Sequence, residues 1–502
     1  MNPICLIIPP SPFLLDERVF MSLGALRVAA SLEKDGVPVE MVDLSGIENF
    51  LDAMKTHALS TQARVFGITA TTPQMPSAFK IAKAIKSVRS NARLILGGPH
   101  PTLVAAAWKK EKAKGIDGRA TKALTQLDEV FDCIVFGDGE QAIFRAIDDS
   151  PPKHIDADDP KTSYFLTNKH LNELPFPSRH LIDAESYHYF IDGERAMSLI
   201  AQLGCPFGCG FCGGRASPML RRIRTRTTEN VVAEIVHLYK TYWVKGFMLY
   251  DDELNVNPEI VNLMNAIGDA QEKLGVQFKL RGFIKSQLFT PAQAQSMYRA
   301  GFRWILTGFE SGSSRILENI QKKATREENT RCVQIAHAHG LKVKALMSIG
   351  HPGESPETIA DTKSWLLENK PEDFDVTIIT PYPGSPYHDD AILENGAWTY
   401  TYPKTGDKLY AKEVDYLQTA DFYKGDPNGG YQSYVWTDAL SPVMLVSERD
   451  RLEREVRQAL GIPYNSSASA VKFEHSMGQG LPPSILRTTK IKENENERIP
   501  IS

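Results

Sequence analysis

The sequence contains no long apolar run and no block of basic residues. No apolar stretch approaches the roughly 20 residues that a membrane-spanning helix needs. Lysine and arginine are spread along the 502 residues, and the formal net charge is −4. The concentrated positive charge that is typical of a nucleic-acid-binding tail is therefore missing. We expect no transmembrane segment and no nucleic acid as an obligate partner.

The N-terminus also lacks the features of a signal peptide. The stretch "MNPICLIIPPSPFLL" is apolar, but prolines interrupt it and no basic leader precedes it. We interpret it as a buried strand followed by a loop. The sequence therefore favours a cytoplasmic protein, in which thiols stay reduced.

Cysteine is scarce, yet three of the six cysteines lie close together in "AQLGCPFGCGFCGGRA": Cys205, Cys209 and Cys212. A structural zinc site usually has four ligands, often from two CxxC pairs, and no second pair or nearby histidine is present. Iron–sulfur clusters are held by cysteine thiolates, and three thiolates leave one iron of a four-iron cluster open. The spacing favours an open-site cluster over zinc or no metal. We expect the isolated Cys5, Cys133 and Cys332 to be small buried hydrophobic residues.

Short apolar runs alternate with amphipathic segments over residues 1–150. The runs at 4–10, 37–46, 64–72, 92–100 and 131–140 predict strands, with helices between them. This alternation is typical of a doubly wound parallel sheet, whose ligands bind beyond the carboxyl ends of the strands. Those ends carry "PPSP", "TATTP", "GGPHP" and "GDGE". The glycines there either let a ligand approach the backbone or only form tight turns.

A second alternation predicts the middle of the chain to be a parallel (β/α) barrel, full or partial. About six strand–helix units occupy residues 196–400, after a polar, proline-containing linker at 151–195. In such barrels the active site lies at the carboxyl ends of the strands. The cysteines, "DDE" at 251–253, "ES" at 310–311 and "GHPGE" at 350–354 all follow predicted strands. We expect residues 401–483 to form a small α+β cap over the barrel mouth and the charged tail at 484–502 to be disordered.

The cysteine loop "CPFGCGFC" resembles the signature loop of the radical S-adenosylmethionine (SAM) superfamily. The segments "RTRTTENVVAEI", "FMLYDDELNVN", "TGFESGSSRILENI", "GHPGESPETI" and "TPYPGSPYH" follow in the order of the landmarks of one subgroup, whose members carry an N-terminal cobalamin-binding domain. The segments "LGGPH" and "FGDGE" resemble that domain. The resemblance covers residues 1 to about 400 and implies a cobalamin-binding sheet domain followed by a radical SAM barrel.

The resemblance implies a role for each matching residue. Cys205, Cys209 and Cys212 would hold a four-iron four-sulfur cluster, whose open iron is chelated by the amino and carboxylate groups of SAM. The other residues implied to contact SAM are Phe211, Asp251, Asp252, Arg281, Glu310, Ser311, Gly350, Pro352 and Gly353. Those implied to contact cobalamin are Gly97, Gly98, His100, Gly137, Gly139 and Glu140. Simpler interpretations remain open: a solvated strand end for "DDE", a helix cap for Ser311 and an ion pair for Arg281.

One motif is missing from the first domain. Many cobalamin-binding domains carry DxHxxG, whose histidine ligates cobalt from below, and neither His57 nor His100 has that spacing. Radical SAM proteins of this subgroup often lack the motif too. The resemblance therefore implies a cobalamin without a histidine on its lower face, or a domain that binds no cobalamin.

The resemblance implies an enzyme that cleaves SAM to a 5′-deoxyadenosyl radical and methylates an unactivated carbon of a small molecule with methylcobalamin. An external electron donor such as flavodoxin or ferredoxin would reduce the cluster. Two alternatives remain open. One is a cyclase, a ring contraction or another carbon–carbon bond-forming enzyme of the same architecture. The other is a non-catalytic metal- or cofactor-binding protein.

Overall fold

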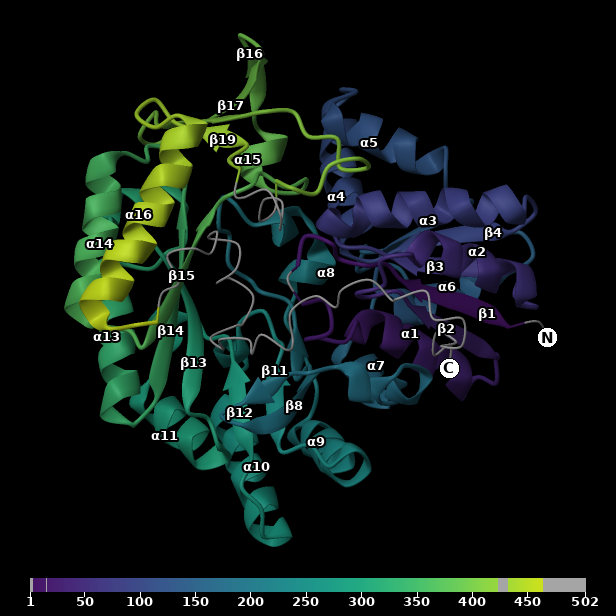
Figure 1. Ribbon diagram of the computed structural model, residues 1–502, viewed down its shortest axis with the longest axis horizontal. Coiled ribbons are helices and arrows are strands. Elements are labelled where there is room, and N and C mark those ends of the chain that lie inside the picture. The colour runs from purple at the N-terminus through teal and green to yellow at the C-terminus, as the bar shows by residue number, and fades with distance from the viewer. Residues whose placement is uncertain (1–2, 15, 423–431, 464–502) are drawn as a thin grey trace.

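The computed structural model describes residues 3–14, 16–422 and 432–463 and begins with a six-stranded parallel sheet (Figure 1). The strand order is β2-β1-β3-β4-β5-β6. Their bounds are β1 (Ile4–Ile8), β2 (Val39–Asp43), β3 (Val65–Thr69), β4 (Arg93–Gly97), β5 (Cys133–Gly137) and β6 (His154–Ala157). The first five strands are those that the apolar runs predict.

Helices cover both faces of this sheet, as a doubly wound fold requires. One face packs on α1 (Leu23–Lys34) and α6 (Gly139–Ile147). The other packs on α2 (Phe50–Ser60), α3 (Met75–Val88), α4 (Pro99–Lys114) and α5 (Arg119–Asp128). All strands are parallel, so their carboxyl ends meet at one edge.

The first predicted domain boundary lies too early. Residues 154–157 belong to the predicted linker, yet they form β6 and pair with β5 at the sheet edge. An edge strand of four residues with alternating burial carries little of the apolar signal that marks the central strands. The rest of the linker crosses to the second domain through α7 (Asn168–Glu173) and β7 (Phe190–Ile191).

The second domain is a partial barrel of six parallel strands. They are β8 (Glu194–Leu199), β11 (Gly246–Leu249), β12 (Lys279–Gly282), β13 (Trp304–Glu310), β14 (Lys342–Ile349) and β15 (Asp373–Ile378). Isolated bridges at Leu280–Phe302 and Phe283–Leu306 join β12 to β13. In the described residues β15 does not pair with β8, so the barrel stays open. Its outside is covered by α9 (Thr228–Tyr242), α10 (Ile260–Leu274), α11 (Pro291–Ala300), α13 (Arg326–Ala338) and α14 (Pro356–Asn369).

The C-terminal region only partly matches the predicted cap. An antiparallel sheet contains β16 (Ile392–Glu394), β17 (Ala397–Thr401), β18 (Lys408–Ala411) and β19 (Val435–Trp436). It packs on the loop after β14, where the Thr437 hydroxyl donates to the Glu354 carbonyl at 2.8 Å. We call β16–β19 the cap sheet. Residues 423–431 and 464–483 of the predicted cap, and the tail, lie outside the described residues.

The helix α16 (Pro442–Leu460) covers the open edge of β15 rather than the barrel mouth. Arg449 donates to the Val376 carbonyl at 2.8 Å, and Glu453 accepts from the Val376 N–H at 3.3 Å. Arg457 donates to the Phe374 carbonyl. These charged side chains therefore satisfy the backbone groups that an edge strand leaves unpaired. Ser441 caps the helix ahead of Pro442, and its side chain accepts from the Met444 N–H.

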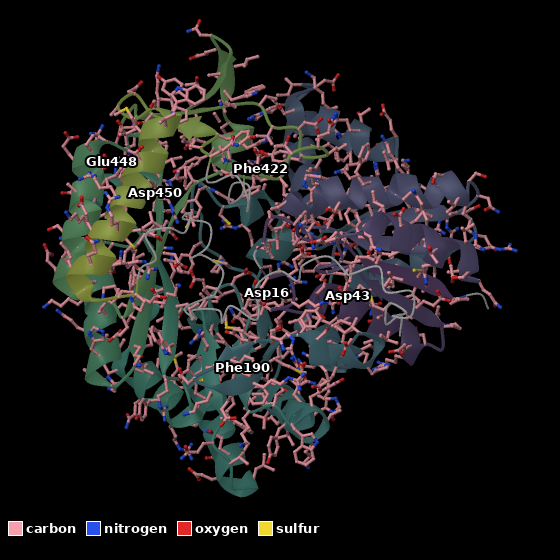
Figure 2. The ribbon with its side chains drawn as sticks, viewed as in Figure 1. Asp16, Asp43, Phe190, Phe422, Glu448 and Asp450 are labelled. Atoms are coloured by element: carbon pink, nitrogen blue, oxygen red, sulfur yellow. The ribbon has the colours of Figure 1, made fainter. Side chains whose placement is uncertain are left out.

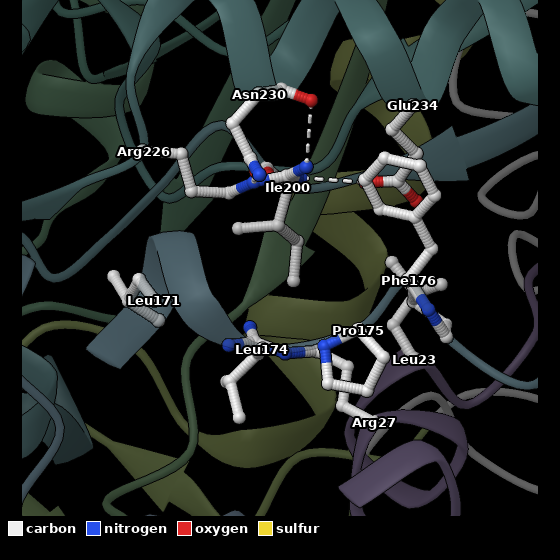
Figure 3. Close-up of a pocket in the computed structure, with 11 residues that line it drawn as sticks. Leu23, Arg27, Leu171, Leu174, Pro175, Phe176, Ile200, Arg226, Asn230 and Glu234 are labelled. Carbon is white, nitrogen blue, oxygen red and sulfur yellow. Dashed lines mark hydrogen bonds and ion pairs between the residues drawn. The ribbon is translucent and has the colours of Figure 1, made fainter. Parts of the chain in front are cut away.

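The linker, residues 151–195, makes hydrogen bonds to the first domain. The Tyr187 hydroxyl donates to Asp43, at the end of β2, over 2.7 Å; Asp43 and nearby Asp16 are labelled in Figure 2. Between α1, α7 and α9 lies a cavity of about 20 Å³, shown in Figure 3. On its wall the buried Glu234 pairs with Arg226 at 2.6 Å and with Arg179 at 2.9 Å. This cavity has room for a water molecule at most, so it belongs to the domain joint.

None of the helices in the described ranges combines the length and the apolar character that crossing a membrane would require.

Candidate functional site

The cysteine loop leaves the barrel after β8 and β9 (Gln202–Leu203) and is held by backbone contacts from three directions. The Cys205 N–H donates to the Leu220 carbonyl at 2.9 Å, and the Gly210 N–H donates to the Ile320 carbonyl at 2.8 Å. Arg221 donates to the carbonyls of Pro206 and Phe207. Gly204 has a φ of +88°, and a Cβ there would lie 2.2 Å from the Arg222 carbonyl oxygen. The loop is therefore pre-shaped by the chain itself.

The three thiols fit a cluster better than a single zinc ion. Cys209 is buried, Cys205 is partly buried and Cys212 is exposed. Among the described residues, the three sulfur atoms of this loop do not all lie within 4.8 Å of one another. Sulfurs on one tetrahedral zinc are separated by roughly 3.8 Å, whereas a cluster places each sulfur on a different iron. Donor type and spacing therefore agree with the open-site cluster.

Two buried lysines lie beside the cysteine loop, and sequence reasoning missed both. The Lys285 ammonium is 4.3 Å from the centre of the Phe207 ring and 3.3 Å from the Lys322 carbonyl. Burial lowers the pKa of Lys285, and the Lys322 ammonium adds to that, while the neighbouring thiols oppose it. The site thus carries positive charge where thiolates are expected. Neither lysine follows directly on a signature segment, so only the fold brings them there.

Glu310, at the end of β13, forms the centre of a hydrogen-bonded chain that reaches the cysteine loop. It accepts from Lys322 at 2.9 Å and from the Ser348 hydroxyl at 2.6 Å. Ser348 is 2.8 Å from His351, which is 3.3 Å from the Tyr387 hydroxyl. The His351 ring also lies 5.4 Å from that of Phe211, between centroids. Ser348 and His351 therefore connect Glu310 with Phe211, and the contacts of both residues with SAM stay predictions.

Burial sets the ionisation of this chain. Burial alone would raise the pKa of Glu310, but Lys322 and Ser348 outweigh it and the pKa is lowered. Burial lowers the pKa of His351 to about 4, so its imidazole is neutral near pH 7. The chain therefore holds one carboxylate against one ammonium, with a neutral histidine between Ser348 and Tyr387.

Three predicted SAM contacts have other partners. Asp251 accepts from the backbone N–H groups of Ala201 and Gln202 and so fixes the chain ahead of the cysteine loop. Ser311 lies 3.1 Å from the Thr362 hydroxyl on α14 and accepts from the Ser313 N–H. Arg281 is buried inside the barrel, where it interacts with Tyr189 and stacks 5.6 Å from Trp304. In this structure all three side chains have partners within the fold, and their contacts with SAM stay predictions.

The remaining predicted SAM contacts divide into two groups. Asp252 is exposed and accepts from the Gly204 backbone, so it stays next to the cysteine loop. Gly350 and Gly353 have positive φ, and a Cβ at either would approach Val435 or Asp407 of the cap region. The Pro352 carbonyl accepts from Asn319 at 2.8 Å. The "GHPGE" loop thus makes room for the cap region.

A cavity of about 370 Å³ opens at the carboxyl ends of β1, β3, β4 and β5. Gly97, Gly98, Gly137, Gly139 and Glu140, which the resemblance implies to contact cobalamin, line it. Apolar residues form most of the wall, including Leu6, Ile68, Ile95, Ile143, Leu203, Met219 and Leu220. The volume lies within the about 300–1,000 Å³ of small-molecule sites. Leu203, Met219 and Leu220 come from the segment around the cysteine loop, so this cavity faces the site of that loop.

The floor and rim of this cavity explain which predicted residues reach it. A Cβ on Gly97 would meet open space, which leaves the floor flat. Glu140 is paired with Arg27 at 3.1 Å on the rim. His100 does not line the cavity: it is buried beside Thr72 at 3.2 Å, and burial lowers its pKa to about 3. His100 therefore lies behind the cavity wall as a neutral, buried side chain, and its contact with the cofactor stays a prediction.

Known families match both parts of the chain. Residues 199–366 match the model of the radical SAM superfamily, and residues 17–128 match the model of the B12 binding domain. The chain therefore contains a radical SAM domain and a B12-binding domain. In the radical SAM domain the match begins just before the cysteine loop and ends in α14.

Relatives and solved structures cover both domains of the chain. An uncharacterised methyltransferase of Pyrococcus horikoshii is 27% identical, over 80% of this chain and 85% of its own. The anaerobic magnesium-protoporphyrin IX monomethyl ester cyclase of Rubrivivax gelatinosus is 24% identical, over 67% of this chain and 61% of its own. The radical SAM methyltransferase TsrM of Kitasatospora setae, solved with cobalamin and a [4Fe-4S] cluster, shares the fold. Its TM-score is 0.63 at 16% identity, over 90% of this chain and 91% of that one.

Proposed function

We propose that this protein is a cobalamin-dependent radical SAM methyltransferase acting on an unactivated carbon of a small molecule. The observation that carries the proposal is the wall shared by the two sites. Leu203 immediately precedes the cysteine loop, and the Leu220 carbonyl accepts from Cys205, yet both line the B12-domain cavity. Two adjacent cofactor sites with a substrate between them are the arrangement that methyl transfer requires.

The chain's own residues fit both groups. Cys205, Cys209 and Cys212 would hold the cluster, and the glycine floor around Gly97 would hold the flat face of cobalamin. When bound, these groups with SAM supply hydrogen-atom abstraction and methyl transfer. The apolar lining of the cavity excludes water from this chemistry.

Lys285 takes the role that the sequence suggested for Arg281. Arg281 is held inside the barrel, whereas the Lys285 ammonium lies against Phe207 of the cysteine loop. A buried ammonium there would pair with the SAM carboxylate by a charge-assisted hydrogen bond. Asp252, which stays beside Gly204, would face the SAM ammonium.

The finer assignments are part of the same proposal. The cap sheet contacts the loop after β14, so it would help to select the substrate at the barrel mouth. A flavodoxin or ferredoxin would deliver electrons to the cluster. A cytoplasmic location suits thiols that must stay reduced.

Anaerobic purification and reconstitution test the proposal. We expect one cluster and one cobalamin per chain, and formation of 5′-deoxyadenosine and S-adenosylhomocysteine from SAM with a strong reductant. The Cys209→Ala variant is the matched control: it should lose the full cluster and SAM cleavage while retaining cobalamin. Absence of both SAM products from a fully loaded protein would contradict the assignment, as would SAM cleavage by Cys209→Ala.

A second candidate is a cyclase without methyl transfer, which the similarity to the magnesium-protoporphyrin cyclase favours. It uses the same two sites and differs only in the product. Mass spectrometry of the product separates the two: methyl transfer adds one methylene unit and forms S-adenosylhomocysteine, whereas cyclisation does neither.

A further inference from the structure

A second group of metal-ligand side chains lies in the first domain, far along the chain from the cysteine loop. Cys5 on β1, Glu40 on β2 and His57 on α2 place their ligand atoms all within 4.8 Å of one another. Cys5 is in the amino-terminal half of β1, whereas the cofactor cavity lies at the carboxyl ends of the strands. Neither proposed cofactor site uses these three residues.

The fold brings the three residues together by register. Cys5 pairs with Glu40 on adjacent parallel strands, so both side chains lie on the same face of the sheet. The helix α2 covers that face and supplies His57 from its last turn. The Thr61 hydroxyl donates to the same Glu40 oxygen that faces His57, which fixes the carboxylate from outside.

One nitrogen faces two acceptors in this group. His57 Nε2 is 3.1 Å from Glu40 Oε2 and 3.5 Å from Cys5 Sγ. A single Nε2 proton can serve one of these atoms well, and a lone pair on Nε2 would face the carboxylate unfavourably. A tetrahedral zinc ion holds nitrogen, oxygen and sulfur ligands roughly 3.3–3.6 Å apart, close to both distances. A metal ion would bind all three atoms at once, whereas a single Nε2 proton donates well to only one of them.

We propose that Cys5, Glu40 and His57 bind one divalent transition-metal ion of the zinc class. One thiolate, one imidazole and one carboxylate form a mixed set that suits zinc better than magnesium or calcium. Cys5 and His57 are buried, whereas the Glu40 side chain is 30% exposed, so a fourth position on the solvent side is left for water. Binding releases the thiol proton and ties α2 to β1 and β2.

Cobalt titration of the full chain tests the site. The parent protein carries Cys205→Ser, Cys209→Ser and Cys212→Ser, so that cluster thiols do not bind the ion. We expect one equivalent of Co²⁺ with a thiolate-to-cobalt charge-transfer band. Cys5→Ser should abolish the band, and His57→Gln should weaken binding by about tenfold or more. Cys133→Ser, which removes a buried cysteine outside the group, should leave the titration unchanged.

A second measurement covers a variant that fails to fold. Zn²⁺ should raise the melting temperature of the parent, and Glu40→Gln, at a partly exposed position, should remove that rise. No charge-transfer band in the parent, or the same band in Cys5→Ser, would overturn the site. So would a zinc-induced rise that persists in Glu40→Gln. None of these outcomes bears on the proposed function, because the cluster cysteines are already replaced.

Discussion

The Glu310 carboxylate lies 2.9 Å from the Lys322 ammonium, and both side chains are largely buried at the end of β13. Glu310 adopts a backbone φ of +66°, which residues other than glycine rarely adopt. The surrounding contacts therefore hold it in this conformation. The backbone carbonyl oxygen of Lys322 in turn accepts a hydrogen bond from the Lys285 ammonium. This pair therefore links the barrel end to the cysteine loop.

Replacement of Glu310 by glutamine should destabilise the protein strongly. The change leaves the Lys322 ammonium buried without a partner, which costs about 3–5 kcal/mol for broken buried pairs. A lower melting temperature measured by calorimetry checks this. Glu318→Gln is the matched control, because its pair with Lys404 is exposed and should matter little. Equal effects of the two changes would contradict a buried, unsupported ammonium.

The SAM affinity should separate Lys285 from Arg281. Lys285→Met removes a charge-assisted hydrogen bond and should weaken SAM binding by about tenfold or more. Arg281→Met should leave SAM affinity nearly unchanged and lower stability instead, because its partners are Tyr189 and Trp304. Equilibrium binding of SAM to cluster-loaded protein, with cluster content measured in parallel, decides. Equal losses of affinity would contradict the assignment of Lys285.

Larger residues at Gly97 should exclude cobalamin in a graded way. A Cβ there meets open space and φ is not positive, so Gly97→Ala and Gly97→Leu introduce no backbone strain. Both side chains would enter the 370 Å³ cavity. We expect a small loss of cobalamin retention for alanine and a near-complete loss for leucine, measured by absorbance, with unchanged cluster content. Full retention in Gly97→Leu would show that cobalamin binds elsewhere.

The Glu354 carboxyl should make stability depend on pH. Burial raises its pKa to about 7, from 4.5. Between about pH 4.5 and 7 the unfolded chain releases this proton before the folded one does, so the free energy of unfolding falls as pH rises. Glu354→Gln lacks the proton and should not lose this stability. Melting temperatures across that range should therefore favour the variant increasingly at higher pH; a constant difference would contradict the raised pKa.

The sequence predicts the two parallel sheets and the cysteine loop because these depend on local signals. Apolar runs mark the buried strands, and glycines with cysteines mark the loop. The strand β6 was not predicted from the sequence, because it is a short edge strand with alternating burial. The helix α16 was expected in a cap, yet its position on β15 depends on side-chain contacts from Arg449 to Val376 that no local pattern reveals.

Individual site residues were harder to predict than the strand ends that carry them. Glu310 and Asp252 lie near the cysteine loop, and the glycines at 97 and 137 line the cavity of the first domain; their cofactor contacts stay predictions. Asp251 and Ser311 turn back to backbone and helix, because a polar side chain at a strand end is satisfied equally well inside the fold. Lys285 and Lys322 reach the site only through the packing of loops from different strands.

The contacts of α16 with β15 predict what a truncated chain would expose. A barrel of six strands that does not close exposes the backbone of β15, and here Arg449, Glu453 and Arg457 occupy it in place of a seventh strand. A chain shortened before residue 442 would leave this row of donors and acceptors as a template for another molecule. By covering the edge of β15, the helix α16 thus prevents two copies of the chain from pairing through that strand.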